Sequence, residues 1–162
     1  VISCPSTSNG IYIYANTQTV GMVSVSCNNL EGVADNTLYS AIRIEGDNVA
    51  NPVARFAVAG NSIISGGRGV RIEGYVNGRA ITGNVIDIVS DSYSNIYLNG
   101  AAAGTVKNIA VSGNSIVDGA YGVEASNTAS IIHDGNVFSS QATSHQTGLA
   151  AGTSGAGGNY IT

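Results

Sequence analysis

Arginine and glutamate recur together in two similar segments of the chain. The segments AIRIEG and GVRIEG place Arg43 and Glu45 in the first, and Arg71 and Glu73 in the second, at the same positions. Side chains two residues apart on a strand point to the same face. We therefore expect each arginine to share an outward face with its glutamate, with a core-facing isoleucine between them.

Tyrosine occupies the position of the arginine in two further segments, GIYI with Tyr12 and NIYL with Tyr97. Aromatic rings stack on the apolar faces of sugars, and guanidinium groups form paired hydrogen bonds with hydroxyl or acidic substituents. Tyr12, Arg43, Arg71 and Tyr97 are therefore candidate carbohydrate-binding residues.

Two further interpretations concern the carboxylates. Glu45 and Glu73 would lie one repeat apart, and two carboxyl groups about 5–5.5 Å apart have the geometry of a retaining glycosidase. They are therefore candidate catalytic residues. Alternatively, the arginines and glutamates form a structural charge network between neighbouring strands. The sequence leaves the network, carbohydrate binding and catalysis open.

These segments belong to one repeat of about 27 to 28 residues that runs along the whole chain. Each repeat has an apolar run with a corner of the Gly-Asn kind, as in VARFAVAGNSI and VKNIAVSGNSI, followed by a short strand such as GVRI. Stacked about 4.8 Å apart, the corner amides could bond to one another as a buried ladder. We expect them to adopt the left-handed conformation that a sharp corner requires. The corner asparagines are Asn28, Asn61, Asn84, Asn114, Asn136 and Asn159.

The short strand of each repeat should contribute one apolar pair to the core, because inward and outward residues alternate. The predicted inward pairs are Ile11 and Ile13, Ile42 and Ile44, Val70 and Ile72, Ile96 and Leu98, Val123 and Ala125, and Leu149 and Ala151. Each turn of the repeat has room for three strands and three connections.

Composition argues against several classes of function. The net charge is −4 and the six basic residues form no cluster in the sequence, which disfavours nucleic-acid binding. No apolar run approaches 18 residues, so we expect no membrane insertion. We also expect no metal and no cofactor, since His145 has no aspartate or cysteine at ligand spacing.

Three remaining side chains have predicted structural roles. His133 aligns with inward valines of other repeats, which predicts a buried histidine rather than a catalytic one. Cys27 takes the place of a corner glycine and Cys4 lies in a different part of the preceding repeat. We expect two small buried thiols instead of a disulfide.

The pattern [IV]-x-[VI]-x-G-N-x-[IVF] followed by G-[IV]-x-[IL] resembles the repeat of right-handed parallel β-helices, the pectate-lyase-like family. The resemblance covers essentially all of the chain and is greatest to a segment of a bacteriophage tailspike. It predicts an all-β fold, a right-handed parallel β-helix of about six rungs, with residues 1–162 as a single domain. Neither end shows a capping element, so we expect a piece of a longer protein or ends covered by partner chains.

The same resemblance implies a function. It predicts a host-recognition module, located in a virion tail or otherwise extracellular, that binds bacterial cell-surface polysaccharide as a homotrimer and could belong to a depolymerase. Two alternatives remain: a secreted polysaccharide lyase or hydrolase of the pectate-lyase type, and an inert structural shaft. The family's inward asparagine ladder agrees with the role expected for the corner asparagines.

Overall fold

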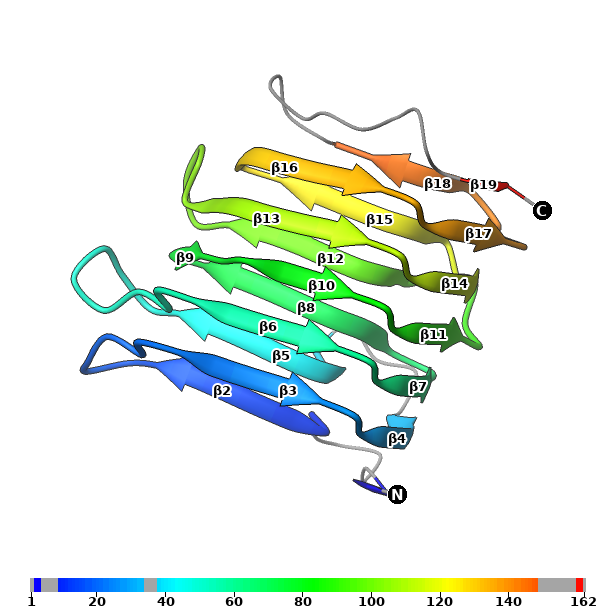
Figure 1. The fold of residues 1–162 in the computed structure, drawn as a ribbon, viewed down its shortest axis with the longest axis horizontal. Coiled ribbons are helices and arrows are strands. Elements are labelled where there is room, and N and C mark those ends of the chain that lie inside the picture. Colours follow the sequence, from blue (N-terminus) through cyan, green and yellow to red (C-terminus); the bar gives the residue numbers. More distant parts are fainter. Residues whose placement is uncertain (1, 4–8, 34–37, 149–159, 162) are drawn as a thin grey trace.

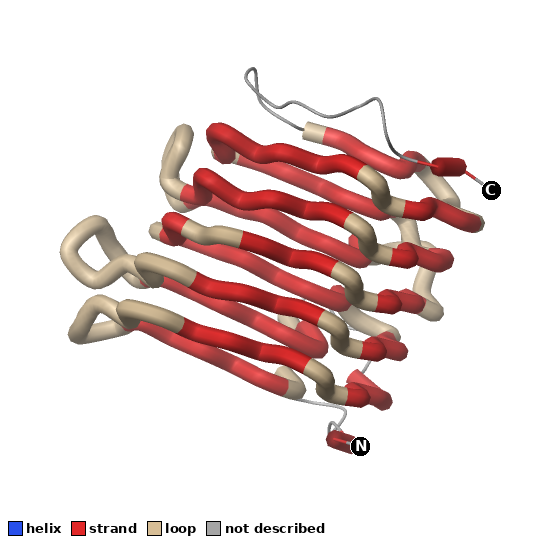
Figure 2. The backbone as a smooth tube through the Cα atoms, viewed as in Figure 1, coloured by secondary structure: helices blue, strands red, loops and turns tan. Residues whose placement is uncertain are grey.

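The chain folds into stacked layers of short strands, shown in Figures 1 and 2. The computed structural model describes residues 2–3, 9–33, 38–148 and 160–161. Within these residues the regular structure is entirely β-strand, arranged in three parallel sheets. This confirms the predicted parallel β-helix. The same residues contain no helix long and apolar enough to cross a membrane.

The three sheets run the length of the coil. In spatial order, sheet A comprises β1 (Ile2–Ser3), β4 (Asn29–Val33), β7 (Ser62–Ser65), β11 (Val85–Ile88), β14 (Ser115–Asp118), β17 (Val137–Ser139) and β19 (Tyr160–Ile161). Sheet B comprises β2 (Ile11–Ala15), β5 (Ser40–Gly46), β8 (Arg68–Gly74), β12 (Ser94–Gly100), β15 (Tyr121–Ser126) and β18 (Ser144–Thr147). Sheet C comprises β3 (Val23–Ser26), β6 (Phe56–Ala59), β10 (Ala80–Thr82), β13 (Val106–Ser112) and β16 (Thr128–Asp134), and the short β9 (Val76–Asn77) pairs with β13.

Each turn of the coil passes through sheets B, C and A in that order. One turn, for example, consists of β12, β13 and β14, and the next begins with β15. Every strand pairs in parallel with its equivalent in the neighbouring turn. Equivalent residues of successive repeats therefore lie directly above one another, as the constant period predicts.

The core is the column of apolar side chains between the three sheets. The predicted inward residues of β5, β8 and β12 are fully buried, and Val123 and Ala125 of β15 are buried as well. Ile11 and Ile13 of the first turn are partly buried and pack against this core. The first five predicted pairs are thus confirmed.

The last strand of sheet B lies earlier in the chain than the sixth predicted pair. The strand that pairs with β15 is β18, in which Gln146 rather than Leu149 lies opposite Val123. A connection of only four residues, 140–143, separates β17 from β18, so the chain enters sheet B earlier than the apolar pattern indicates. Leu149 and Ala151 lie outside the described residues.

The described corner asparagines form a continuous ladder that is half-buried at Asn28 and buried at the other members. The side-chain Nδ2 of each donates to the Oδ1 of the next, at 3.0 Å for the first pair and 2.9 Å for the other three. Each backbone N–H donates to the same Oδ1. The ladder members described are Asn28, Asn61, Asn84, Asn114 and Asn136. Asn159 lies outside the described residues.

The backbone at the corner differs from expectation. The left-handed conformation belongs to the residue before each of the five described corner asparagines, as at Gly83 and Gly113, both with φ of 63°. None of the five corner asparagines in the described part of the chain has a positive φ. Their amides are therefore free to point inward while the preceding residue makes the bend.

Cys27 occupies this bend position with φ of 57° and its side chain is exposed. The prediction of a buried thiol is wrong for this residue. A side chain at the bend points away from the core, since a Cβ added at the equivalent Gly83 would have no neighbour within 4 Å. Cys4 lies outside the described residues.

Candidate functional site: the outer face of sheet B

The outer face of sheet B carries two columns of polar and aromatic side chains, one residue per turn from each column. The first column runs Tyr12, Arg43, Arg71, Tyr97 and Glu124. The second runs Tyr14, Glu45, Glu73, Asn99 and Ser126. We call these ten residues the sheet B wall. The predicted carbohydrate-binding residues are therefore neighbours, and the two candidate catalytic glutamates are adjacent in the second column.

Ion pairs connect the arginines and glutamates of the wall. Arg43 Nη2 lies 2.9 Å from Glu45 Oε2 and 2.9 Å from Glu73 Oε2. Arg71 Nη2 lies 2.6 Å from Glu73 Oε1. Arg43 also donates from Nε to Glu73 Oε2 at 3.0 Å. The cross-strand charge network considered from the sequence is thus present, whatever other role these residues have.

Arg43 affects what the two carboxylates could do chemically. Its guanidinium bonds to both, so it fills the space between Glu45 and Glu73. A retaining glycosidase needs that space for the anomeric carbon of its substrate. This geometry favours a structural or binding role for the pair over catalysis.

Tyr12 and Tyr14 form the most exposed aromatic surface of the wall. Their rings stack with centroids 5.7 Å apart and an interplanar angle of 11°. Their exposed fractions are 46% and 40%. The hydroxyl of Tyr12 donates to Glu45 Oε2 at 2.5 Å, and that of Tyr14 donates to Asp47 Oδ1 at 3.0 Å. Both rings are fixed in orientation while much of their surface stays accessible.

Three effects raise the pKa of Tyr12 to about 12. Burial is the largest, the hydrogen bond to Glu45 is the next, and the negative charge of that carboxylate is the third. The hydrogen bond to Asp47 is the main cause that raises the pKa of Tyr14. Both hydroxyls therefore remain protonated donors at neutral pH.

Tyr97 has a different environment from Tyr12. The guanidinium carbon of Arg68 lies 4.3 Å from the centroid of the Tyr97 ring, and that of Arg71 lies 5.7 Å away. Arg68 is also 5.7 Å from the ring of Tyr93. The pKa of Arg68 is lowered mainly by burial and secondly by the nearby positive charge of Arg71. Arginine side chains thus already cover part of the Tyr97 ring, leaving it less available to a sugar than Tyr12.

Arg68 is a residue of this face that the sequence did not identify. Counting back from Val70 by simple alternation would place it in the core. Instead Gly69 and Val70 both face inward, since a Cβ at Gly69 would lie 2.5 Å from Ile86 Cγ2 and Val70 is fully buried. Two successive inward residues shift Arg68 to the outer side. The glycine run Gly66, Gly67 and Gly69 around the arginine was the available signal.

A similar irregularity occurs in the next turn, where Ser94, Asn95 and Ile96 are all buried. Asn95 donates from Nδ2 to the backbone oxygen of Asp118 at 2.7 Å. The hydroxyl of Ser94 donates to the carboxylate of Glu124, which is a member of the wall. The charged groups on this face are therefore held by hydrogen bonds as well as by ion pairs.

His133 lies in the core, as the sequence predicted. It pairs with Val111 on the neighbouring strand, and its exposed fraction is 3%. Burial lowers the pKa of its imidazole. The unfolded chain therefore takes up a proton near pH 6.5 that the folded protein resists.

We expect this difference to make the protein less stable in mild acid. Above pH 6.5 the imidazole is neutral in both states, so His133 does not lower the free energy of unfolding. As the pH drops from 6.5 toward the lower pKa of the folded protein, that free energy falls by at most about 1.4 kcal/mol per pH unit. Urea unfolding at a series of pH values from 8 to 5 measures it. A His133→Leu variant should lose this part of the slope; an unchanged slope in the variant would assign it to other groups.

Within the part of the chain that the structure describes, no group of three or more histidine, cysteine, aspartate or glutamate side chains could hold a metal ion. Comparisons of the chain with protein-family models, with curated proteins and with solved structures gave no match. The function is therefore inferred from the wall itself.

Proposed function

We propose that the sheet B wall binds a bacterial cell-surface polysaccharide, as in a host-recognition module of the tailspike type. The main support is the exposed Tyr12–Tyr14 stack, which adjoins the row of ion pairs formed by Arg43, Glu45 and Glu73. Exposed aromatic faces beside fixed charged groups suit the apolar face and the hydroxyl groups of a sugar. Because ion pairs and hydrogen bonds already orient these groups, little ordering is needed on binding.

The glycan would lie along the coil axis. Successive rungs are about 4.8 Å apart, so neighbouring rungs would offer neighbouring subsites to a linear chain. The proposal assigns no catalytic step to Glu45 and Glu73, and an accompanying depolymerase activity would need other residues. The homotrimer and the extracellular or virion location implied by the resemblance remain part of this proposal.

Glycan-array binding tests the proposal with two variants. Tyr12→Ala removes part of the exposed aromatic stack, and Arg71→Met removes a guanidinium of the wall. Each should weaken binding to a recognised glycan about fivefold, the size expected for loss of one stacking or charged contact. Arg79→Met is a matched control, because Arg79 is an exposed arginine outside the wall. It should bind as the unmodified protein does.

The competing function is an inert structural shaft, and one observation favours it. The arginines of the wall already bond to its own glutamates, and Arg68 covers the ring of Tyr97. A shaft predicts no glycan binding, with Arg71→Met lowering only the free energy of unfolding, by about 1 kcal/mol or less. An array without signal for the unmodified protein, alongside a shifted melting curve for Arg71→Met, would exclude the carbohydrate proposal.

A further inference from the structure

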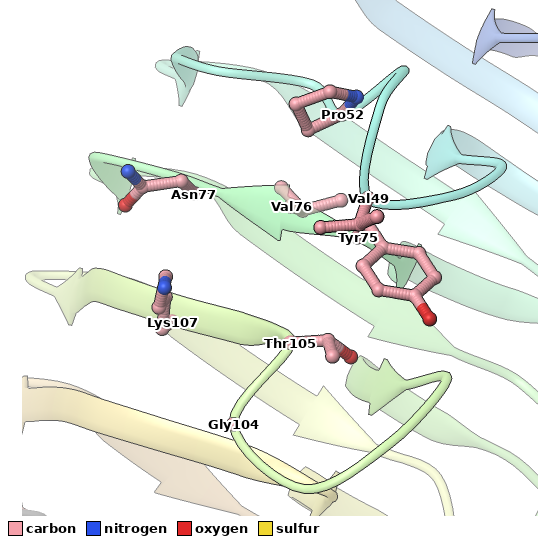
Figure 3. Close-up of a pocket in the computed structure, with 8 residues that line it drawn as sticks. All are labelled: Val49, Pro52, Tyr75, Val76, Asn77, Gly104, Thr105 and Lys107. Carbon is pink, nitrogen blue, oxygen red and sulfur yellow. The ribbon is translucent and has the colours of Figure 1, made fainter.

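A pocket of about 280 Å³ opens at the corner where sheet B passes into sheet C (Figure 3). The lining residues that matter here are Val49, Pro52, Tyr75, Asn77, Thr105 and Lys107. None of these residues belongs to the sheet B wall. The size is just below the range typical of small-molecule sites, about 300–1,000 Å³. A single monosaccharide is therefore a suitable size of ligand.

The pocket exists because one connection is much shorter than its two neighbours. Residues 47–52 and 101–105 form projecting loops in the second and fourth turns, whereas Tyr75 alone connects β8 to β9 in the turn between them. Figure 1 shows both loops at the left edge of the coil, with β9 between them. The missing loop leaves a slot about one rung spacing, roughly 4.8 Å, in thickness. A slot of this thickness suits a flat ring.

Hydrogen bonds hold both walls of the slot in place. In loop 47–52, Asn48 Oδ1 accepts from the backbone N–H groups of Ala50 and Asn51, at 2.9 and 3.1 Å. In loop 101–105, the Thr105 hydroxyl lies within donating distance of the backbone oxygens of Gly74 and Ala102, at 2.8 and 2.9 Å, and donates its one proton to either. The pocket is thus formed before any ligand enters.

The polar side of the pocket offers hydrogen-bond donors. Lys107 and Asn77 are paired neighbours on β13 and β9. Asn77 Oδ1 accepts from Asn108 Nδ2 at 2.7 Å, which directs the acceptor end of its amide to Asn108 and leaves its Nδ2 group for a ligand. Lys107 is exposed and takes part in no salt bridge among the described residues. No carboxylate lines the pocket.

The remaining lining is apolar or aromatic. Val49 and Pro52 lie on one side, and the ring of Tyr75 lies at the base of loop 47–52 (Figure 3). Such a surface can contact the apolar face of a sugar, while the ammonium and amide groups bind an acidic substituent. Chemically, the pocket combines a flat apolar slot with a polar side that offers an ammonium group and an amide donor and has no carboxylate.

We propose that this pocket binds a sugar unit that carries a carboxylate, such as a uronic acid. The Lys107 ammonium pairs with the carboxylate, Asn77 Nδ2 donates to the carboxylate or an adjacent hydroxyl, and the sugar ring lies in the slot between Val49 of one loop and Thr105 of the other. This site is separate from the sheet B wall, so either could bind while the other does not.

Amide NMR titration of the full chain with glucuronate, glucose or inorganic phosphate tests the proposal. Glucuronate should shift the amide signals of Asn77, Thr105 and Lys107 with saturation in the millimolar range, typical of a single sugar unit. Glucose should bind at least about tenfold more weakly, because the charged hydrogen bonds are lost. Lys107→Met should weaken glucuronate binding about tenfold. Lys107→Arg keeps the positive charge and should bind glucuronate within about threefold of the unmodified protein. The control Arg79→Met should bind glucuronate as the unmodified protein does.

Each of the following outcomes would overturn the proposal. Pocket signals that do not move up to about 50 mM glucuronate would exclude a site of useful affinity. If glucose bound as tightly as glucuronate, or if Lys107→Met bound glucuronate as tightly as the unmodified protein, recognition of the carboxylate would be excluded. Phosphate binding as tightly as glucuronate would leave an anion site without sugar specificity. Shifts confined to Arg43, Arg71 and their neighbours would overturn the pocket while supporting the wall.

Discussion

Replacing Gly74 by alanine is expected to lower the free energy of unfolding by about 4 kcal/mol, the size of effect seen when a substitution forces two backbone segments apart. A Cβ at this position would lie 2.1 Å from the backbone oxygen of Gly46 on the neighbouring strand. That oxygen accepts the hydrogen bond of Tyr75 N–H at 3.0 Å. Gly74 also has φ of 75°, which strains any residue with a side chain. Neither strand can yield without breaking the ladder of sheet B.

Gly83→Ala separates the clash from the backbone strain. Gly83 has φ of 63° but no atom within 4 Å of an added Cβ. The equivalent position of an earlier turn is occupied by Cys27 with φ of 57°, so the bend accepts a side chain. We expect a loss of about 1 kcal/mol from strain alone. Chemical unfolding of both variants makes the comparison, and equal losses would show that the contact with Gly46 is unimportant.

Asn114→Ala should cost about 3 kcal/mol of unfolding free energy, because it leaves two buried backbone groups without a partner. Asn114 Oδ1 accepts from the backbone N–H of Asn84 at 3.0 Å, and from its side-chain Nδ2 at 2.9 Å. Asn114 Nδ2 donates to the backbone oxygen of Ile81 at 2.9 Å. Alanine supplies none of these contacts, and the buried site excludes water as a substitute.

Asn16→Ala is the appropriate control, since Asn16 is exposed and outside the ladder. Its substitution should change stability by no more than about 0.5 kcal/mol. Urea unfolding of the two variants under the same conditions gives the difference. If Asn114→Ala were as mild as Asn16→Ala, the ladder would contribute little beyond what the backbone already provides.

Much of the fold could be predicted because burial repeats with a fixed period. Ile42, Val70 and Ile96 each take one place in consecutive turns, so the alternation around them identifies the core and the outer columns. The ion pair between Arg43 and Glu73 follows from that register and from the opposite charges. Likewise, the position of the corner asparagines predicts their ladder.

Other features depend on local departures from the period. Arg68 reaches Tyr97 only because Gly69 and Val70 both face inward, which alternation does not foresee. The strand β18 is polar, so an apolar pattern misplaces it. The pocket beside Lys107 arises from the lengths of three connections, and repeat alignment treats such connections as gaps. Sequence periodicity thus predicts the stacked strands and their core, and it misses the loops and irregularities that shape the surface.

The asparagine ladder also has a direction. In every described pair the donor belongs to the earlier turn and the acceptor to the later one. The amide dipoles therefore align head to tail along the coil, with their positive ends toward the C-terminal turns, much as peptide dipoles add up in a helix. Aligned hydrogen bonds polarise one another, so each added turn strengthens those already formed. An interior break such as Asn114→Ala would divide one long dipole into two short ones, and so weaken bonds several turns away from the substitution.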